Sequence, residues 1–272
     1  KAVSVDDVVE VGSNPIPLPR VDYETPAGLG GPDAPRIAVY KSWDEPMPEG
    51  WTRWVLDEHE IPYDTLHDAD IQQGQLAGYD VLLMEDQEEE SIIEGWSCQE
   101  MPEPYCGGLG DEGVQRVEDF VRDGGHLIAV GGATDFAIET LELNIRNAVG
   151  DLPPEDFYIP GSILRIHNDQ SDPLTVGMPS ESSAWFWRSS RAFDVADADY
   201  QVPVWYGSGN PLLSGWILGP EHLAGRPAVV RAPVGSGSVV LFGFPPNYRG
   251  QTMATWPLLF NALEAGGDIS TR

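Results

Sequence analysis

The chain has 272 residues, with 44 acidic against 15 basic side chains, so its formal net charge at pH 7 is −29 and its pI is about 4.2. It lacks the basic surface that phosphate backbones and anionic lipids require, which excludes nucleic-acid binding and membrane-surface binding. A hydrophobic content of 41% is sufficient for a packed core. The acidity fits either a salt-adapted source or a secreted protein from an arginine-preferring genome.

The chain has the features expected of an extracellular protein. No apolar run approaches the roughly 20 residues that cross a bilayer. The sequence opens at Lys1 without an initiator Met or a signal peptide, so we expect a processed chain or a piece of a longer one. Cys98 and Cys106 share one loop rich in Gly and Pro, and we expect them to form a disulfide in an oxidising compartment, with two free thiols as the alternative.

Residues 1–35 are dense in Pro and Gly and are predicted to form an extended linker. From residue 36 onward, short apolar runs alternate with segments of helical periodicity, which is typical of a doubly wound α/β sheet. The predicted strands cover 37–40, 63–66, 79–84 and 126–130, and the predicted helices cover 51–59, 111–122 and 135–141.

The segment 152–225 is predicted to be a β-rich elaboration within this α/β domain of residues 36–265. Its strand-like runs are 162–166, 184–187, 202–206 and 212–218. The runs 228–231 and 238–244 then flank Gly235-Ser236-Gly237, which is typical of a hairpin turn. A closing helix is expected over 252–263, with a C-terminal tail over 266–272.

Candidate ligand-binding side chains follow the predicted strands. In open α/β sheets ligands bind beyond the carboxyl ends of the strands, so the loops at these ends are the place to look. Arg249 could hold a carboxylate through two hydrogen bonds, and Trp43, with Trp51 nearby in sequence, could supply an apolar wall. Loop caps and ordinary salt bridges are the alternative roles. The predicted ligand-binding residues are Ser42, Trp43, Asp86, Gln87, Asp135, Arg249 and Gln251.

The same loops offer no nucleophile or metal site that the sequence can identify. The glycine turn after the fourth strand contains neither Ser nor Cys, and Thr134 is more typical of a helix cap. Cys106 does not follow an apolar strand and has no evident base. No His is followed three residues later by Glu, as a zinc carboxypeptidase site requires. We therefore expect no catalytic residue, no metal and no cofactor in this chain.

Several short stretches resemble one known family. They are 36–43, 49–56, 107–110, 135–138, 157–162, 213–216, 241–244 and 249–252. Together they resemble a class I glutamine amidotransferase-like domain that is found C-terminal to bacterial zinc carboxypeptidase-like peptidases. The resemblance implies a flavodoxin-like fold and a secreted parent protein whose N-terminal peptidase domain holds the zinc. It carries no catalytic residue onto this chain, because the elbow lacks the family's cysteine.

Three functional hypotheses follow. The first is a non-catalytic accessory domain that packs against the peptidase domain, binds a small molecule or peptide end, or forms a homo-oligomer. The second is a hydrolase or amidase that uses a carboxylate pair such as Asp86 and Asp135, whose proximity would separate their pKa values. The third is a carbohydrate- or surface-binding module, which the nine Trp residues suggest.

Overall fold

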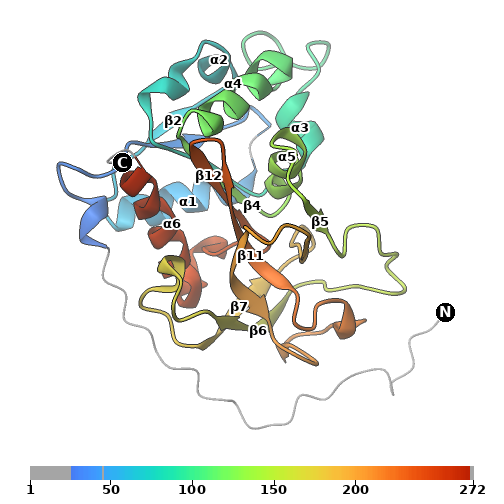
Figure 1. Cartoon of the computed structure of the whole chain (residues 1–272). Helices are drawn as coiled ribbons and strands as arrows, with labels where there is room; N and C mark the ends of the chain where they lie inside the picture. Colours follow the sequence, from blue (N-terminus) through green and yellow to red (C-terminus); the bar gives the residue numbers. More distant parts are fainter. Residues whose placement is uncertain (1–25, 45, 270–272) are drawn as a thin grey trace.

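The computed structural model describes residues 26–44 and 46–269, and its centre is one mixed ten-stranded sheet. The strand order is β10-β6-β9-β11-β12-β4-β3-β1-β2, and β7 pairs with β6 beside this path. In Figure 1 the strands β1 to β4, blue to green, lie in the upper part of the molecule, and the antiparallel half, yellow to orange, lies below them. Strand β12 joins the two halves.

The parallel half confirms the predicted doubly wound α/β architecture. Its strands pair in parallel in the order β2-β1-β3-β4-β12. The four inner strands are short and mostly apolar because both faces of the sheet are covered there, as is typical of parallel sheets, whereas the edge strand β2 has an exposed Asp64. Their bounds are β1 (Ile37–Tyr40), β2 (Asp64–Leu66), β3 (Val81–Met84), β4 (His126–Val130) and β12 (Gly237–Phe242).

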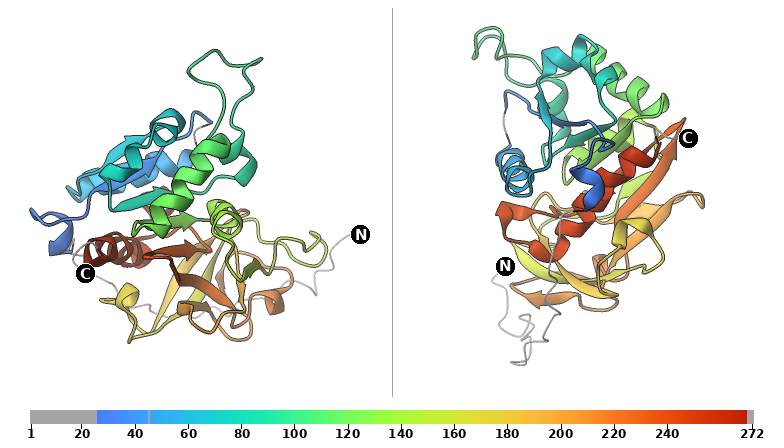
Figure 2. Two further views of the ribbon diagram at one scale, coloured as in Figure 1. Left: turned by 45° about the horizontal axis from the view of Figure 1, so that its top comes forward. Right: turned by 90° about the vertical axis from the view of Figure 1, so that its left-hand side faces the viewer.

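Alternate residues of these strands belong to two separate cores. Val39 and Leu83 face the core shared with α1 and α6, whereas Ala38 and Leu82 face the core shared with the other helices. This alternation follows from the two-residue period of a strand, and the right-hand view of Figure 2 shows helices on both sides of the sheet. The helices are α1 (Met47–Glu58), α2 (Asp68–Gln72), α3 (Glu89–Ile93), α4 (Gly110–Arg122), α5 (Ala133–Thr140) and α6 (Trp256–Ile269).

The β-rich elaboration extends the same sheet with antiparallel strands. The expected hairpin at Gly235 and Ser236 is present, because β11 pairs antiparallel with β12 up to the pair Val234 and Gly237. A separate two-stranded sheet joins β5 to β8. The strands are β5 (Ile145–Asn147), β6 (Ser162–Asn168), β7 (Glu181–Phe186), β8 (Phe193–Val195), β9 (Gln201–Tyr206), β10 (Leu212–Ser214) and β11 (Pro227–Val234).

The two chain ends differ from the predicted boundaries. Of the expected linker 1–35, residues 1–25 lie outside the described residues, and Leu29 is buried in the core that contains α6. Helix α6 continues to Ile269, through residues 266–269 that were expected to belong to the tail. Cys98 and Cys106 form the expected disulfide, with an S–S distance of 2.03 Å.

Candidate functional site

Two adjoining pockets lie at the carboxyl ends of the parallel strands. The strand-end pocket has a volume of about 290 Å³ and is lined by residues 46–48, 51, 86–88, 187, 189, 245 and 247–249. The side pocket has a volume of about 630 Å³, and its lining includes Asp135, Arg188 and Arg191. The segment 187–191 lines both pockets, and so does Glu88. Loops from both halves of the sheet therefore build this region.

Strand β4 enters α5 through a sharp turn at Gly131, where a nucleophile elbow would present its reactive side chain. Gly131 has φ +55°, a left-handed conformation that favours glycine. An ideal Cβ on Gly131 would lie 2.5 Å from the carboxylate carbon Cγ of Asp86. The position of a nucleophile therefore has no side chain, and the neighbouring carboxylate fills its space.

The Asp86 carboxylate is held in place by hydrogen bonds. Its Oδ1 accepts a 2.8 Å hydrogen bond from the backbone N–H of Gly132, and its Oδ2 accepts one from the hydroxyl of Ser189. The hydroxyl of Thr134, which is fully buried, donates to the carbonyl of Gly131 at 2.6 Å. Thr134 is therefore a local structural group, as its place at a helix start suggested.

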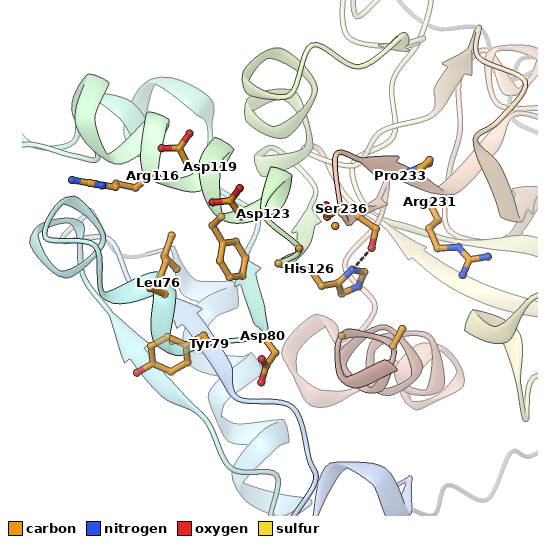
Figure 3. A pocket seen from close by; sticks show the side chains of 18 of the residues that line it. Leu76, Tyr79, Asp80, Arg116, Asp119, Asp123, His126, Arg231, Pro233 and Ser236 are labelled. Carbon is orange, nitrogen blue, oxygen red and sulfur yellow. Dashed lines mark hydrogen bonds between the residues drawn. The ribbon is translucent and has the colours of Figure 1, made fainter. Parts of the chain in front are cut away.

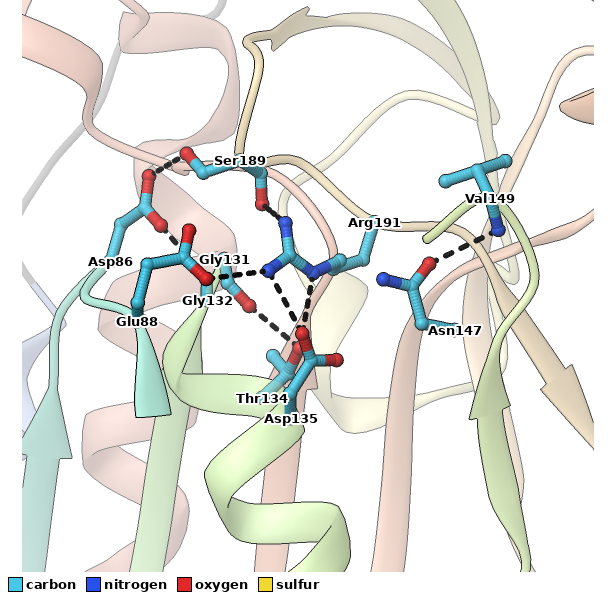
Figure 4. A network of polar contacts seen from close by, with 10 residues as sticks. All are labelled: Asp86, Glu88, Gly131, Gly132, Thr134, Asp135, Asn147, Val149, Ser189 and Arg191. Atoms are coloured by element: carbon cyan, nitrogen blue, oxygen red, sulfur yellow. Dashed lines mark hydrogen bonds and ion pairs between the residues drawn. The ribbon is translucent and has the colours of Figure 1, made fainter. Parts of the chain in front are cut away.

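Arg191 is the centre of the polar network drawn in Figure 4. Its side chain is 9% exposed and lies 2.8 Å from Asp135, with Glu88 at 3.6 Å. It also donates to the carbonyl of Ser189. A chain of contacts thus connects Asp86, Ser189, Arg191 and Asp135, and the two carboxylates lie at its opposite ends.

The structure brings together only part of the predicted site. Asp86, Gln87 and Arg249 line the strand-end pocket, and Ser42 lies 3.1 Å from the Gln87 amide nitrogen, from which it accepts a hydrogen bond. Asp135 lines the side pocket.

Two predicted residues lie elsewhere. Trp43 stacks on His67, with ring centroids 3.8 Å apart, and contacts Tyr105 edge-on. Gln251 is exposed and lines neither pocket.

Three aromatic rings wall the strand-end pocket, and the predicted set contains none of them: Trp51, Trp187 and Tyr248. Trp185 stacks on Tyr248 with ring centroids 5.0 Å apart, and Trp187 lies 5.9 Å from the same ring. The alternation of Trp185 and Trp187 along the end of β7 was the sequence signal, because it places both rings on one face of the strand.

Glu85 follows β3 and is buried beneath the pocket. Its Oε1 accepts a hydrogen bond from Thr52, whose hydroxyl also accepts one at 2.6 Å from Asn247. Its Oε2 has no hydrogen-bond partner among the described residues. Burial raises the pKa of Glu85 from 4.5 to about 7, and the nearby Asp86 charge adds to this rise.

A larger groove lies at the opposite ends of the parallel strands, around the amino ends of β3 and β4 (Figure 3). His126 lines it and is 1% exposed, and its Nδ1 lies 2.7 Å from the Ser238 hydroxyl. Burial lowers the pKa of His126 from 6.5 to about 4, and the charge of Arg231 lowers it further. None of the predicted ligand-binding residues lines this groove.

Within residues 26–44 and 46–269, no group of three or more His, Cys, Asp or Glu side chains is placed to hold a metal ion. Over the same residues, no helix combines the length and apolarity that a membrane span requires.

Comparison with solved structures defines the class of fold. A protein of Thermoplasma acidophilum described as a GMP synthase subunit superposes with a TM-score of 0.55 at 10% identity, covering 87% of this chain and 96% of its own. A ThuA-like protein of Bacteroides uniformis superposes with a TM-score of 0.53 at 12% identity, covering 84% of this chain and 89% of its own. A cytoplasmic protein of Salmonella typhimurium LT2 superposes with a TM-score of 0.54 at 15% identity, covering 84% of this chain and 98% of its own.

These similarities concern the fold alone, since the identities are low. The protein has a class I glutamine amidotransferase-like α/β fold, as the sequence resemblance implied. No protein-family model matches the sequence, and no curated protein sequence matches it. The comparisons give no link to a zinc carboxypeptidase.

Proposed function

We propose that this chain is a non-catalytic, ligand-binding domain that uses the strand-end pocket of an amidotransferase-like fold. The observation that carries the proposal is the elbow at Gly131. A fold that acts through a nucleophile needs a reactive side chain at this turn, with a base beside it. Here the residue is glycine, and the Asp86 carboxylate lies where the reactive group would be.

The arrangement of the carboxylates also favours binding over hydrolysis. A hydrolase that used Asp86 and Asp135 would need the two groups to share one site. Asp86 is instead held by Gly132 and Ser189, and Asp135 is paired with Arg191, on the side of the adjoining pocket. Two carboxylates in these roles stabilise loops and leave the pocket walls to contact a ligand.

The experiment is a turnover screen of the whole chain against glutamine, other amides and esters. The proposal expects no saturable turnover above buffer, for the wild type and for Asp86→Asn alike. Saturable turnover that Asp86→Asn abolishes would establish the carboxylate-based hydrolase instead. Thermal unfolding of both proteins serves as the control that the variant is folded.

The identity of the parent protein rests on the sequence resemblance alone. On that basis the domain belongs to a secreted zinc carboxypeptidase-like protein and packs against its N-terminal peptidase domain, with self-association as a further role. The Cys98–Cys106 disulfide supports an extracellular location, since such bonds persist in oxidising compartments. The test is the reading frame upstream of Lys1: we expect a peptidase domain with a His-x-x-Glu motif there, and an upstream frame that encodes no such domain would refute the assignment.

A further inference from the structure

We infer that the strand-end pocket takes a sugar ring that carries a carboxylate, a hexuronate unit, with this carboxylate on Arg249. The inference rests on the proposed function and names the ligand class for the same pocket. Four observations on the described residues carry it: an arginine without an acidic partner among them, strained backbone at that arginine, aromatic walls, and two pocket-lining amides whose oxygens are left to accept hydrogen bonds.

Arg249 differs from most arginines of this chain in its ion pairing. Acidic side chains outnumber basic ones by 44 to 15. Among the described residues, every arginine except Arg188 and Arg249 forms an ion pair with Asp or Glu. Both exceptions border the strand-end region, and Arg249 is the one that lines the strand-end pocket. Such a guanidinium in so acidic a chain is available for the carboxylate of a ligand.

The backbone holds Arg249 in a costly conformation. Its φ is +51°, in the left-handed region that side chains other than glycine rarely adopt. Its guanidinium carbon lies 5.2 Å from the centre of the Tyr248 ring, over the ring face. The cation therefore lies against a wall of the pocket, and strain of this kind is concentrated at ligand-binding positions.

The aromatic walls select a ligand with a flat, weakly polar face. Trp187 and Tyr248 are partly buried, and each also lines the pocket. Trp51 adds a third ring. The C–H face of a pyranose ring matches such a surface, because it is apolar while its edge carries hydroxyls. A free phosphate or a small aliphatic acid has no face of this kind.

Two amide side chains that line the pocket can accept hydrogen bonds from a ligand. The amide nitrogen of Gln87 donates to Ser42 and to the carbonyl of Asp44, and that of Asn247 donates to Thr52. Their carbonyl oxygens accept no hydrogen bond from any described residue, although both side chains line the pocket. Hydroxyl groups would satisfy these oxygens, whereas a plain aromatic acid would not.

The size of the pocket suits a ligand of one ring. Its volume of about 290 Å³ lies just below the roughly 300 Å³ at which small-molecule sites begin. A single hexuronate unit, with its ring against Trp187 and Tyr248 and its carboxylate on Arg249, satisfies all four observations.

The experiment measures binding of matched sugar pairs to the whole chain by calorimetry and tryptophan fluorescence. The probes are D-glucuronate, D-galacturonate and D-mannuronate, each beside its neutral hexose, which differs only at C6. We expect at least one uronate to bind about tenfold more tightly than its hexose, the gain from one bidentate carboxylate contact. Equal affinity of every uronate and its hexose, or no binding by any uronate, would overturn the inference.

Variants locate the contact. Arg249→Ala and Arg249→Gln should reduce uronate affinity to that of the hexose and leave hexose affinity unchanged. Arg188→Ala is the matched control, because it removes one positive charge from the neighbouring pocket and should change neither affinity. If Arg188→Ala weakens uronate binding as much as Arg249→Ala does, the carboxylate position is wrong.

The two proposals fail separately. Turnover of amides or esters would refute the non-catalytic function whatever the sugars do. If no uronate binds more tightly than its hexose, the ligand class is refuted. If hexoses still bind and Trp187→Ala abolishes that binding, the strand-end pocket is still the ligand site.

Discussion

The Asp86 carboxylate occupies the space that a side chain on Gly131 would need. The two residues follow neighbouring parallel strands, and an ideal Cβ on Gly131 would lie 2.5 Å from Cγ of Asp86. The same carboxylate accepts a hydrogen bond from the next residue, Gly132. One acidic side chain therefore both blocks the elbow and stabilises its backbone.

Gly131→Ala should destabilise the protein by about 2 kcal/mol, because the Cβ meets Asp86 and the left-handed backbone penalises any L side chain by about 1–2 kcal/mol. Urea unfolding measures the change. Gly50→Ala is the matched control: this exposed glycine lies within α1 with nothing near its Cβ, so the substitution should stabilise by up to about 1 kcal/mol. Similar effects at the two sites would contradict the steric argument.

Glu85→Gln should remove a pH dependence of stability. The pKa of Glu85 is raised from 4.5 to about 7. Its contribution to the free energy of unfolding is therefore complete below pH 4.5 and is lost as pH rises through 7, a change of about 3 kcal/mol. Gln stays neutral, so the variant should be the more stable protein at pH 8.5 and equal the wild type near pH 4. Unfolding free energies across this range test it. As a control, Glu221→Gln, at an exposed position, should leave the pH dependence of the unfolding free energy as in the wild type.

His126 should make the free energy of unfolding depend on pH with the opposite sign. Its pKa is lowered from 6.5 to about 4, so its contribution is present above pH 6.5 and is lost as pH falls through 4, by about 3 kcal/mol. A His126→Phe/Ser238→Ala variant, which removes both hydrogen-bonding groups, should lack this acid destabilisation. Between pH 4.5 and 6.5 the contributions of Glu85 and His126 oppose each other. Replacing only Glu85 should therefore expose the histidine slope, and an unchanged profile would contradict the assignment.

Asp135→Asn should lower the free energy of unfolding by about 2 kcal/mol. The Arg191 side chain is 9% exposed and would lose its carboxylate at 2.8 Å, although Asp135 is itself 34% exposed and Glu88 remains at 3.6 Å, which reduces the loss. A double-mutant cycle with Arg191→Met measures the coupling free energy. The exposed pair Glu118 and Arg122 is the control, and Glu118→Gln should cost no more than about 0.5 kcal/mol. Equal costs would contradict a structural role for the network.

The sequence predicts the parallel half of the fold well and the site only in part. His126–Val130 is a strand with the predicted bounds, since five apolar or buried residues between two turns leave few alternatives. The strand-end rule finds Asp86, Gln87 and Arg249, because sheet topology alone fixes which loops meet. It does not find Ser189 or Arg191, which reach Asp86 and Asp135 across long sequence separations from an irregular loop.

Side-chain burial is the second place where sequence and structure differ. The helical face that Trp54 shares with Val55 predicts a core position for its ring, yet Trp54 is 41% exposed. Its ring lies edge-on to Trp51, with centroids 6.0 Å apart. Periodicity places a residue on a face of a helix, whereas neighbouring segments decide whether that position is covered, and here they leave the Trp54 ring 41% exposed.

The position of β12 has a consequence for how the chain is made. This strand completes the parallel half beside β4, yet it comes from residues 237–242, more than a hundred residues after its neighbour. During synthesis the edge of β4 stays unpaired until this late part of the sequence leaves the ribosome, and open strand edges attract other chains. The nascent protein therefore needs protection by its acidic charge or by a chaperone until β12 arrives, and folding should be a late, concerted event.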